Sequence, residues 1–109
     1  MLYELVVESP IYSKEAKSEV RQLEVEKETE KTYKIKSGSR LYRNTIKKSE
    51  LGTIQTLSEV YVIWFTDIST LEDHKATIMC LLNDVISNHL LKVKRLQDMK
   101  EAIIKVKGM

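Results

Sequence analysis

The stretch Ser69–Val106, STLEDHKATIMCLLNDVISNHLLKVKRLQDMKEAIIKV, contains neither Pro nor Gly and divides the chain in two. Its apolar residues recur at three- and four-residue steps, which is the period of an amphipathic helix. A straight helix of this length would be roughly 57 Å long at about 1.5 Å per residue. Because the first 68 residues form no sheet of that length, the helix is expected either to fold back on itself or to project and pair with other copies.

The start of this helix and a candidate break are both encoded in the stretch. Ser69 and Glu72 match the capping-box pattern, which predicts that the helix begins at Ser69. Ser87–His89 is the poorest helix-forming segment, so a bend or a helical hairpin near residue 88 is one alternative. The other is a continuous helix with a polar layer inside a bundle, where such a layer fixes the oligomeric state. Cys80, the single cysteine, is expected to be a small core residue.

The residues before Ser69 have the pattern of short β-strands. Strands are expected over residues 2–8, 20–27, 31–36, 40–46, 53–57 and 59–66. Val60–Phe65 is apolar on both faces, which is typical of a central strand covered on both sides. Gly52 lies in a turn where a positive φ is expected. The sequence therefore predicts an α+β fold in a single domain, 1–109, with an antiparallel sheet over 1–68 and a helical arm over 69–107 that is used for oligomerisation.

Charge is balanced in total but alternates in blocks along the chain. The 109 residues carry 18 bases and 16 acids, and the net charge of +2 gives no global argument for nucleic-acid binding. Residues 1–30 and 51–91 are acidic, whereas residues 31–50 and the segment from Lys92 onward are basic. The two basic blocks either meet to form one anion-binding surface, or pair with the acidic blocks across strands and protomers.

Several functional classes lack a signature in this chain. The three glycines are dispersed, so there is no phosphate-binding loop, and one cysteine with His74 and His89 does not make a zinc motif. No catalytic constellation is recognisable, so we expect neither an enzyme nor a cofactor or metal. No long apolar run and no secretion signal are present, which predicts a soluble protein of the cytoplasm without membrane contact.

Binding chemistry is concentrated in Lys34–Arg43, where four cations, two hydroxyls and an aromatic ring surround a turn. Arg40 and Arg43 are candidates for holding a phosphate through paired hydrogen bonds. Trp64 and Phe65 are neighbours in the strongest strand, so their side chains point to opposite faces. Trp64 is expected in the core and Phe65 is the candidate for stacking on a nucleobase, the alternative being that both are core residues.

The chain resembles small phage and prophage proteins of Gram-positive hosts in the segments Lys31–Ile35, Ser39–Tyr42 and Lys47–Thr53. It looks most like the Thoeris anti-defence sponge family, in the order and length of its elements rather than in a strict motif. That resemblance implies an N-terminal antiparallel sheet, long C-terminal helices, and assembly into dimers or higher oligomers. It also implies that the protein sequesters a cyclic nucleotide signal, such as a cyclic ADP-ribose isomer or a cyclic oligonucleotide, without degrading it.

The resemblance also suggests contacts for the ligand. Arg40 matches a phosphate contact and Phe65 a base contact, while Asp98 is a candidate for binding a ribose hydroxyl. Lys92 stands where an arginine is expected, which is a departure from the family pattern. Two other functions remain open from the sequence: an anti-CRISPR-like protein that binds and inhibits a bacterial immune effector, and a small nucleic-acid-binding module that uses the basic residues 31–50.

Overall fold

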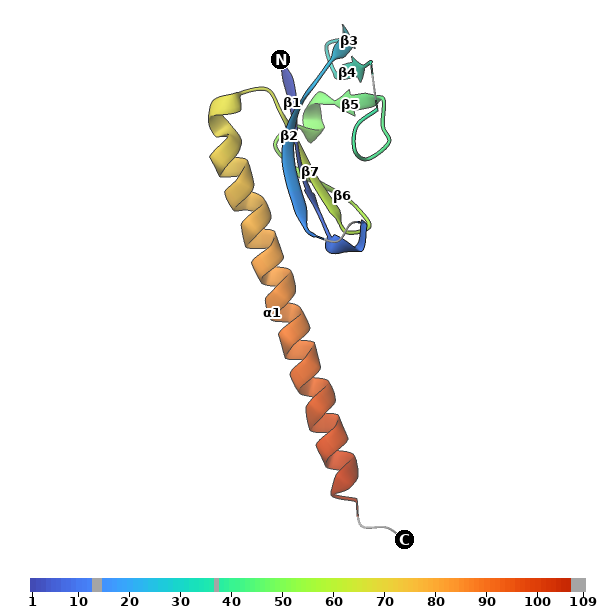
Figure 1. Cartoon of the computed structure of the whole chain (residues 1–109), viewed down its shortest axis with the longest axis vertical. Helices are drawn as coiled ribbons and strands as arrows, with labels where there is room; N and C mark the ends of the chain where they lie inside the picture. Colours follow the sequence, from blue (N-terminus) through green and yellow to red (C-terminus); the bar gives the residue numbers. More distant parts are fainter. Residues whose placement is uncertain (13–14, 37, 107–109) are drawn as a thin grey trace. The chain divides into compact units, whose positions relative to one another are not determined.

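The computed structural model describes residues 1–12, 15–36 and 38–106, and within these ranges the chain is α+β (Figure 1). Its contacts divide it into two compact units, Met1–Ile78 and the segment from Met79 onward. The first unit therefore ends inside the helix rather than at residue 68. Each unit is described by itself below.

The first unit contains seven strands and three short 3-10 helices among its described residues. The strands are β1 (Leu2–Glu8), β2 (Lys17–Leu23), β3 (Val25–Glu28), β4 (Thr32–Ile35), β5 (Thr45–Lys47), β6 (Ile54–Leu57) and β7 (Val60–Phe65). The 3-10 helices are Pro10–Tyr12, Lys48–Glu50 and Ile68–Thr70. The strands form two sheets, one of order β2-β1-β7-β6 and one of order β3-β4-β5, and every pairing is antiparallel. The antiparallel prediction is confirmed, with two sheets in place of one.

One hydrophobic cluster joins the two sheets. The cluster contains alternate residues of β1 and β7 in the four-stranded (large) sheet, such as Val6 and Val62. It also contains Ile35 and Ile46 from the three-stranded (small) sheet. The full cluster is Leu2, Val6, Leu23, Ile35, Leu41, Ile46, Val60, Val62 and Trp64. Because period-two alternation sends these side chains to one face of the large sheet, the small sheet and Leu41 cover that face.

The opposite face of β7 is also buried. Phe65 is only 3% exposed, stacks on Tyr3 at 5.5 Å between ring centroids, and meets the His74 ring at 4.7 Å. His74 belongs to the first turns of the helix, which are part of the first unit. The prediction that Val60–Phe65 is a central strand covered on both sides is confirmed.

Two predicted strands differ from the structure. The strand expected over 20–27 is two strands, broken at Glu24 and followed by a register shift between Val25 and Lys27. The strand expected over 40–46 is confined to Thr45–Lys47, because Tyr42 has a φ of 60° and turns the chain. The hydroxyl of Ser39 accepts hydrogen bonds from the backbone N–H groups of Leu41 and Arg43, which holds this turn. Gly52 has a φ of 78°, as predicted.

The helix α1 (Leu71–Ile104) is continuous over 34 residues, so the hairpin alternative near residue 88 is wrong. Three weak helix formers cost only about 0.5 kcal/mol each, which does not break a helix that is regular on both sides. The capping-box prediction is also wrong. Asp67 accepts hydrogen bonds from the N–H and the hydroxyl of Ser69, at 3.0 and 2.7 Å, and Ser69 lies in the preceding 3-10 helix.

The structure also tests the predictions for Cys80 and for membrane-spanning segments. Cys80 is exposed, so its prediction as a core residue is wrong. Within residues 1–12, 15–36 and 38–106, no helix is both long and apolar enough to cross a membrane.

Candidate ligand-binding site

A buried carboxylate organises the interior of the first unit. Glu4 is 0% exposed and lies in register between Arg21 on β2 and Trp64 on β7. It accepts hydrogen bonds from Arg21 Nη2 at 2.5 Å, from Trp64 Nε1 at 2.9 Å and from the backbone N–H of Arg40 at 3.1 Å. The charge is therefore paired and hydrogen-bonded, as a buried charge must be. Sequence reasoning missed Glu4, although its position between Leu2 and Val6 on the inward face was the available signal.

Arg40 is held at the surface above this network. Its Nε donates to the carboxylate of Glu8, and its Nη1 lies 3.5 Å from the hydroxyl of Tyr42. The hydrogen bond from Arg40 lowers the pKa of Glu8 below 4.5, and the bond to Glu8 raises the pKa of Arg40. The guanidinium is thus fixed in direction before any ligand arrives.

The guanidinium of Arg43 is occupied by interactions with other residues of the protein. Its Nη1 and Nη2 each donate to one carboxylate oxygen of Glu50 at 2.6 Å, and its guanidinium carbon lies 5.1 Å from the centroid of Trp64. This two-point pairing lowers the pKa of Glu50. Both contacts stabilise the fold of the 39–50 segment, so Arg43 is less suited than Arg40 to receive a phosphate.

The remaining predicted site residues belong to other segments of the chain. The ring of Phe65 is buried between Tyr3 and His74, so the structure places it in the core, which was the alternative for this residue. Lys92 and Asp98 are exposed on α1 in the second unit, where Asp98 accepts from Lys94 at 3.5 Å. Only Arg40 and Arg43 of the predicted set come from one compact segment of the first unit.

A pocket of about 220 Å³ lies beside Arg40. It is lined by Arg40, Tyr42, Leu57, Ser58 and Val60, of which Tyr42 is 79% exposed. Tyr42 and Ser58 have φ values of 60° and 54°, and among the described residues only these two that are not glycine have a positive φ. Left-handed backbone costs about 1–2 kcal/mol for such residues and clusters at functional sites.

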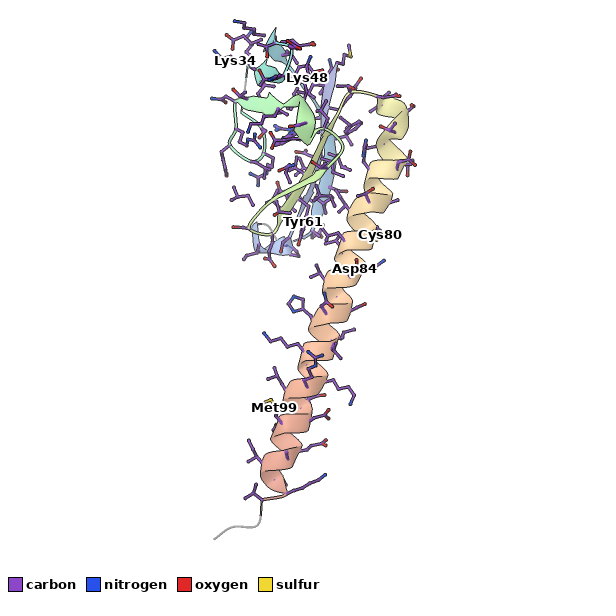
Figure 2. The ribbon with its side chains drawn as sticks, turned by 180° about the vertical axis from the view of Figure 1, so that it is seen from behind. Lys34, Lys48, Tyr61, Cys80, Asp84 and Met99 are labelled. Atoms are coloured by element: carbon purple, nitrogen blue, oxygen red, sulfur yellow. The ribbon has the colours of Figure 1, made fainter. Side chains whose placement is uncertain are left out.

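A second cationic surface, the lysine face, lies on the sheet β3-β4-β5. Lys27 is directly opposite Lys34, and Lys34 is opposite Thr45, so these side chains share one face. Thr32 and Lys47, the next pair along, belong to the same face. Lys34 lies on this sheet and Lys48 directly after it (Figure 2). Because directly opposed like charges destabilise a sheet, the Lys27–Lys34 pair is a cost to folding.

A second pocket, of about 350 Å³, lies at the end of the lysine face. It is lined by Glu30, Lys31, Thr32, Lys47, Lys48 and Ser49. The ammonium group of Lys48 already interacts within the protein. Its Nζ donates to Glu28 at 2.7 Å and lies 5.0 Å from the centroid of the Tyr33 ring. Lys31 and Lys47 are exposed and supply the positive charge of this pocket.

Comparison with known proteins gives no relative: no protein-family model, no curated protein and no solved structure matches the chain. In the part of the chain that the structure describes, no group of three or more His, Cys, Asp or Glu side chains is arranged to hold a metal ion.

Proposed function

We propose that this protein binds and sequesters an anionic cyclic nucleotide without transforming it. The observation that carries the proposal is the pocket in which the fixed guanidinium of Arg40 lies beside the exposed ring of Tyr42 and the hydroxyl of Ser58. A guanidinium holds phosphate oxygens, an aromatic ring stacks on a base, and a hydroxyl completes the polar contacts. These residues bind by charge, stacking and hydrogen bonding, which is why we propose binding without turnover.

In this proposal Tyr42 takes the stacking role that the sequence suggested for Phe65. Tyr42 is 79% exposed, whereas Phe65 is 3% exposed. Glu8 has a supporting part, because its hydrogen bond with Arg40 orients the guanidinium. Glu8 also offsets part of the positive charge, so the affinity for a phosphate depends on excluding water around Arg40.

The small volume of the pocket is an argument that several copies of the chain assemble around the ligand. At about 220 Å³ it is smaller than the 300–1,000 Å³ of typical small-molecule sites. A cyclic dinucleotide or cyclic ADP-ribose isomer would extend beyond it, so we propose that a homo-oligomer closes the site. Lys92 and Asp98, both exposed on α1, are the candidate contributions of a second copy. The resemblance to the Thoeris anti-defence sponges gives the biological setting: a phage protein that removes an immune signal in the cytoplasm of its host.

The test is native mass spectrometry of the purified full chain, followed by calorimetric titration with a panel of cyclic nucleotides. We expect discrete oligomers that gain nucleotide mass, and we expect Arg40→Ala to lose binding while the oligomer persists. Lys75→Ala is the matched control, since Lys75 is an exposed cation that pairs along the helix with Glu72. Oligomers that take up no nucleotide from the panel would contradict the proposal, and unchanged binding by Arg40→Ala would contradict the site.

The lysine face favours a second candidate function, binding of a phosphate backbone. Lys27, Lys34 and Lys47 share one face of a sheet, and threonine hydroxyls lie between them. Such a surface binds nucleic acid without sequence preference and with an affinity that falls steeply with salt. Titration of a fluorescent single strand at two salt concentrations tests it: Lys34→Glu should weaken binding, and Lys75→Glu should not.

A further inference from the structure

The large sheet ends in a row of four side chains, one from each of its strands (Figure 1). Lys17 on β2 lies opposite Glu8 on β1, and Glu8 lies opposite Val60 on β7. Val60 in turn lies opposite Leu57 on β6. Directly opposed residues of neighbouring strands point to the same face, and a row across four strands is about 14 Å long. Because Val60 belongs to the hydrophobic cluster, this end row lies on the face that the cluster occupies.

Two pockets open next to each other on the end row. The Arg40 pocket includes Val60 and Leu57. A larger pocket of about 450 Å³, here called the β1-β2 pocket, is lined by Val6, Glu8, Ala16, Lys17, Ser18 and Glu19. Because Glu8 lies opposite Val60, the two pockets adjoin between β1 and β7, where Arg40 pairs with Glu8. The two pockets therefore form one surface that this ion pair divides.

Lys17 gives the β1-β2 pocket a cation close to the cation of the Arg40 pocket. The hydrogen bond from Arg40 lowers the pKa of Glu8 most, and the charge of Lys17 lowers it further. The carboxylate of Glu8 is thus flanked by two bases, and the three groups together have a net charge of +1. In the part of the chain that the structure describes, the ammonium of Lys17 makes no salt bridge, so it is available to an anion.

Glu19 places a hydrogen-bond acceptor beside Lys17. The two residues are two positions apart on β2, so their side chains share the face of the end row, and both are exposed. Glu19 lies opposite Val6, which is 1% exposed and forms an apolar floor. An ionised carboxylate only accepts hydrogen bonds, so Glu19 suits the hydroxyls of a ribose or the amino group of a base. The pocket thus combines a cation for a phosphate with an acceptor for a nucleoside.

We propose that the β1-β2 pocket is the second half of the nucleotide site. One phosphate of the ligand lies on Arg40, a second phosphate lies on Lys17, and Glu19 accepts hydrogen bonds from a nucleoside of the same ligand. This inference rests on the proposed function and narrows its ligand to nucleotides with at least two phosphates, in preference to a cyclic mononucleotide. The portion of the ligand that exceeds the Arg40 pocket of about 220 Å³ then lies on the same sheet, where a second copy covers it.

Calorimetric titration of the full chain tests the preference for two phosphates. The probes are cyclic di-AMP, cyclic di-GMP and a cyclic ADP-ribose isomer, each with two phosphates, and cyclic AMP with one. We expect the tightest two-phosphate probe to bind at least about tenfold more tightly than cyclic AMP, since it gains hydrogen bonds to charged groups. Cyclic AMP that binds as tightly as every two-phosphate probe would overturn the inference.

Substitutions in the β1-β2 pocket test the residues. Lys17→Ala and Glu19→Ala should each weaken binding of the two-phosphate probe about tenfold and leave cyclic AMP binding unchanged, whereas Arg40→Ala should lose both. Lys17→Arg keeps the charge and should keep the affinity. The matched controls are Lys27→Ala and Glu26→Ala, which change exposed residues on the edge strand β3 of the small sheet and should not affect binding.

The outcomes distinguish this inference from the proposed function. A wild-type chain that binds none of the probes contradicts both. Binding that Arg40→Ala loses but that Lys17→Ala and Glu19→Ala retain in full overturns the second half-site alone. Fluorescence of Trp64, which is buried in the first unit, verifies that each variant folds.

Discussion

The carboxylate of Glu4 accepts the indole N–H of Trp64 at 2.9 Å, across adjacent strands in the interior of the first unit. The same carboxylate accepts from Arg21 and from the backbone of Arg40. Through the Arg40 bond, the segment that carries the candidate pocket is attached to the large sheet. Glu4 is thus a positioning residue for Arg40 as well as a part of the core.

Glu4→Gln should destabilise the first unit by about 2–4 kcal/mol, because it leaves Arg21 without a counter-charge and turns an acceptor into a donor. Urea unfolding followed by Trp64 fluorescence measures the change. Glu24→Gln is the control: its side chain is 70% exposed in an ion pair with Lys36, so it should cost less than about 0.5 kcal/mol. Equal effects of the two substitutions would contradict the role of Glu4.

Stability should fall at acidic pH through Glu8 and Glu50. Arg40 and Arg43 lower the pKa values of these carboxyls from 4.5, so each favours folding above that value. The contribution is lost as the pH falls below 4.5 through the folded-state pKa values. Free energies of unfolding measured from neutral pH to about pH 3 check this.

The Arg43–Glu50 pair allows a specific test of that acid sensitivity. Glu50→Gln should lower stability at neutral pH and make its decline with acid shallower. Arg43→Gln should have the same effect on the slope, because it removes the cation that lowers the pKa of Glu50. If neither substitution changes the slope, the pair does not contribute to the acid sensitivity.

Two glycines form a matched pair for testing backbone conformation. Gly52 has a φ of 78°, so Gly52→Ala should destabilise the protein by about 1 kcal/mol. A Cβ on Gly38 would lie 3.5 Å from the Asn44 side chain, an ordinary contact, and no positive φ is present there. Gly38→Ala should therefore be neutral or stabilise by up to about 1 kcal/mol. Thermal unfolding of the two variants compares them, and a larger loss in Gly38→Ala would be the contrary result.

Tyr42 should show opposite effects on stability and binding. Its φ is 60°, a conformation that asparagine adopts more readily than tyrosine, so Tyr42→Asn should stabilise the fold by up to about 1 kcal/mol. The same change removes the exposed ring and should weaken nucleotide binding at least about tenfold. Ser58→Asn relieves a similar φ of 54° without removing an aromatic ring, so its effect on stability measures the strain alone. Because Ser58 also lines the pocket, this variant is compared for stability and not for binding. If Tyr42→Asn binds the nucleotide as tightly as the wild type, the ring of Tyr42 does not contribute to the site.

Local pattern determined the elements of this protein. Runs of apolar and β-branched residues located β1 and β7, and the absence of Pro and Gly located the long helix. The turn at Gly52 followed from the freedom of glycine. Such features depend on neighbouring residues, which the sequence displays directly. The segments around Glu24 and Tyr42 were predicted less well, because a bulge and a side-chain-stabilised turn there interrupt the alternation.

The tertiary structure decided which charges and rings are free to act. The sequence identified Arg40, Arg43 and Phe65 as candidates, but contacts with residues distant in the chain separate their roles. Glu8 orients Arg40, Glu50 occupies Arg43, and Tyr3 with His74 covers Phe65. The physical reason is that burial and ion pairing are set by long-range packing, whereas composition and periodicity report only what each segment does locally.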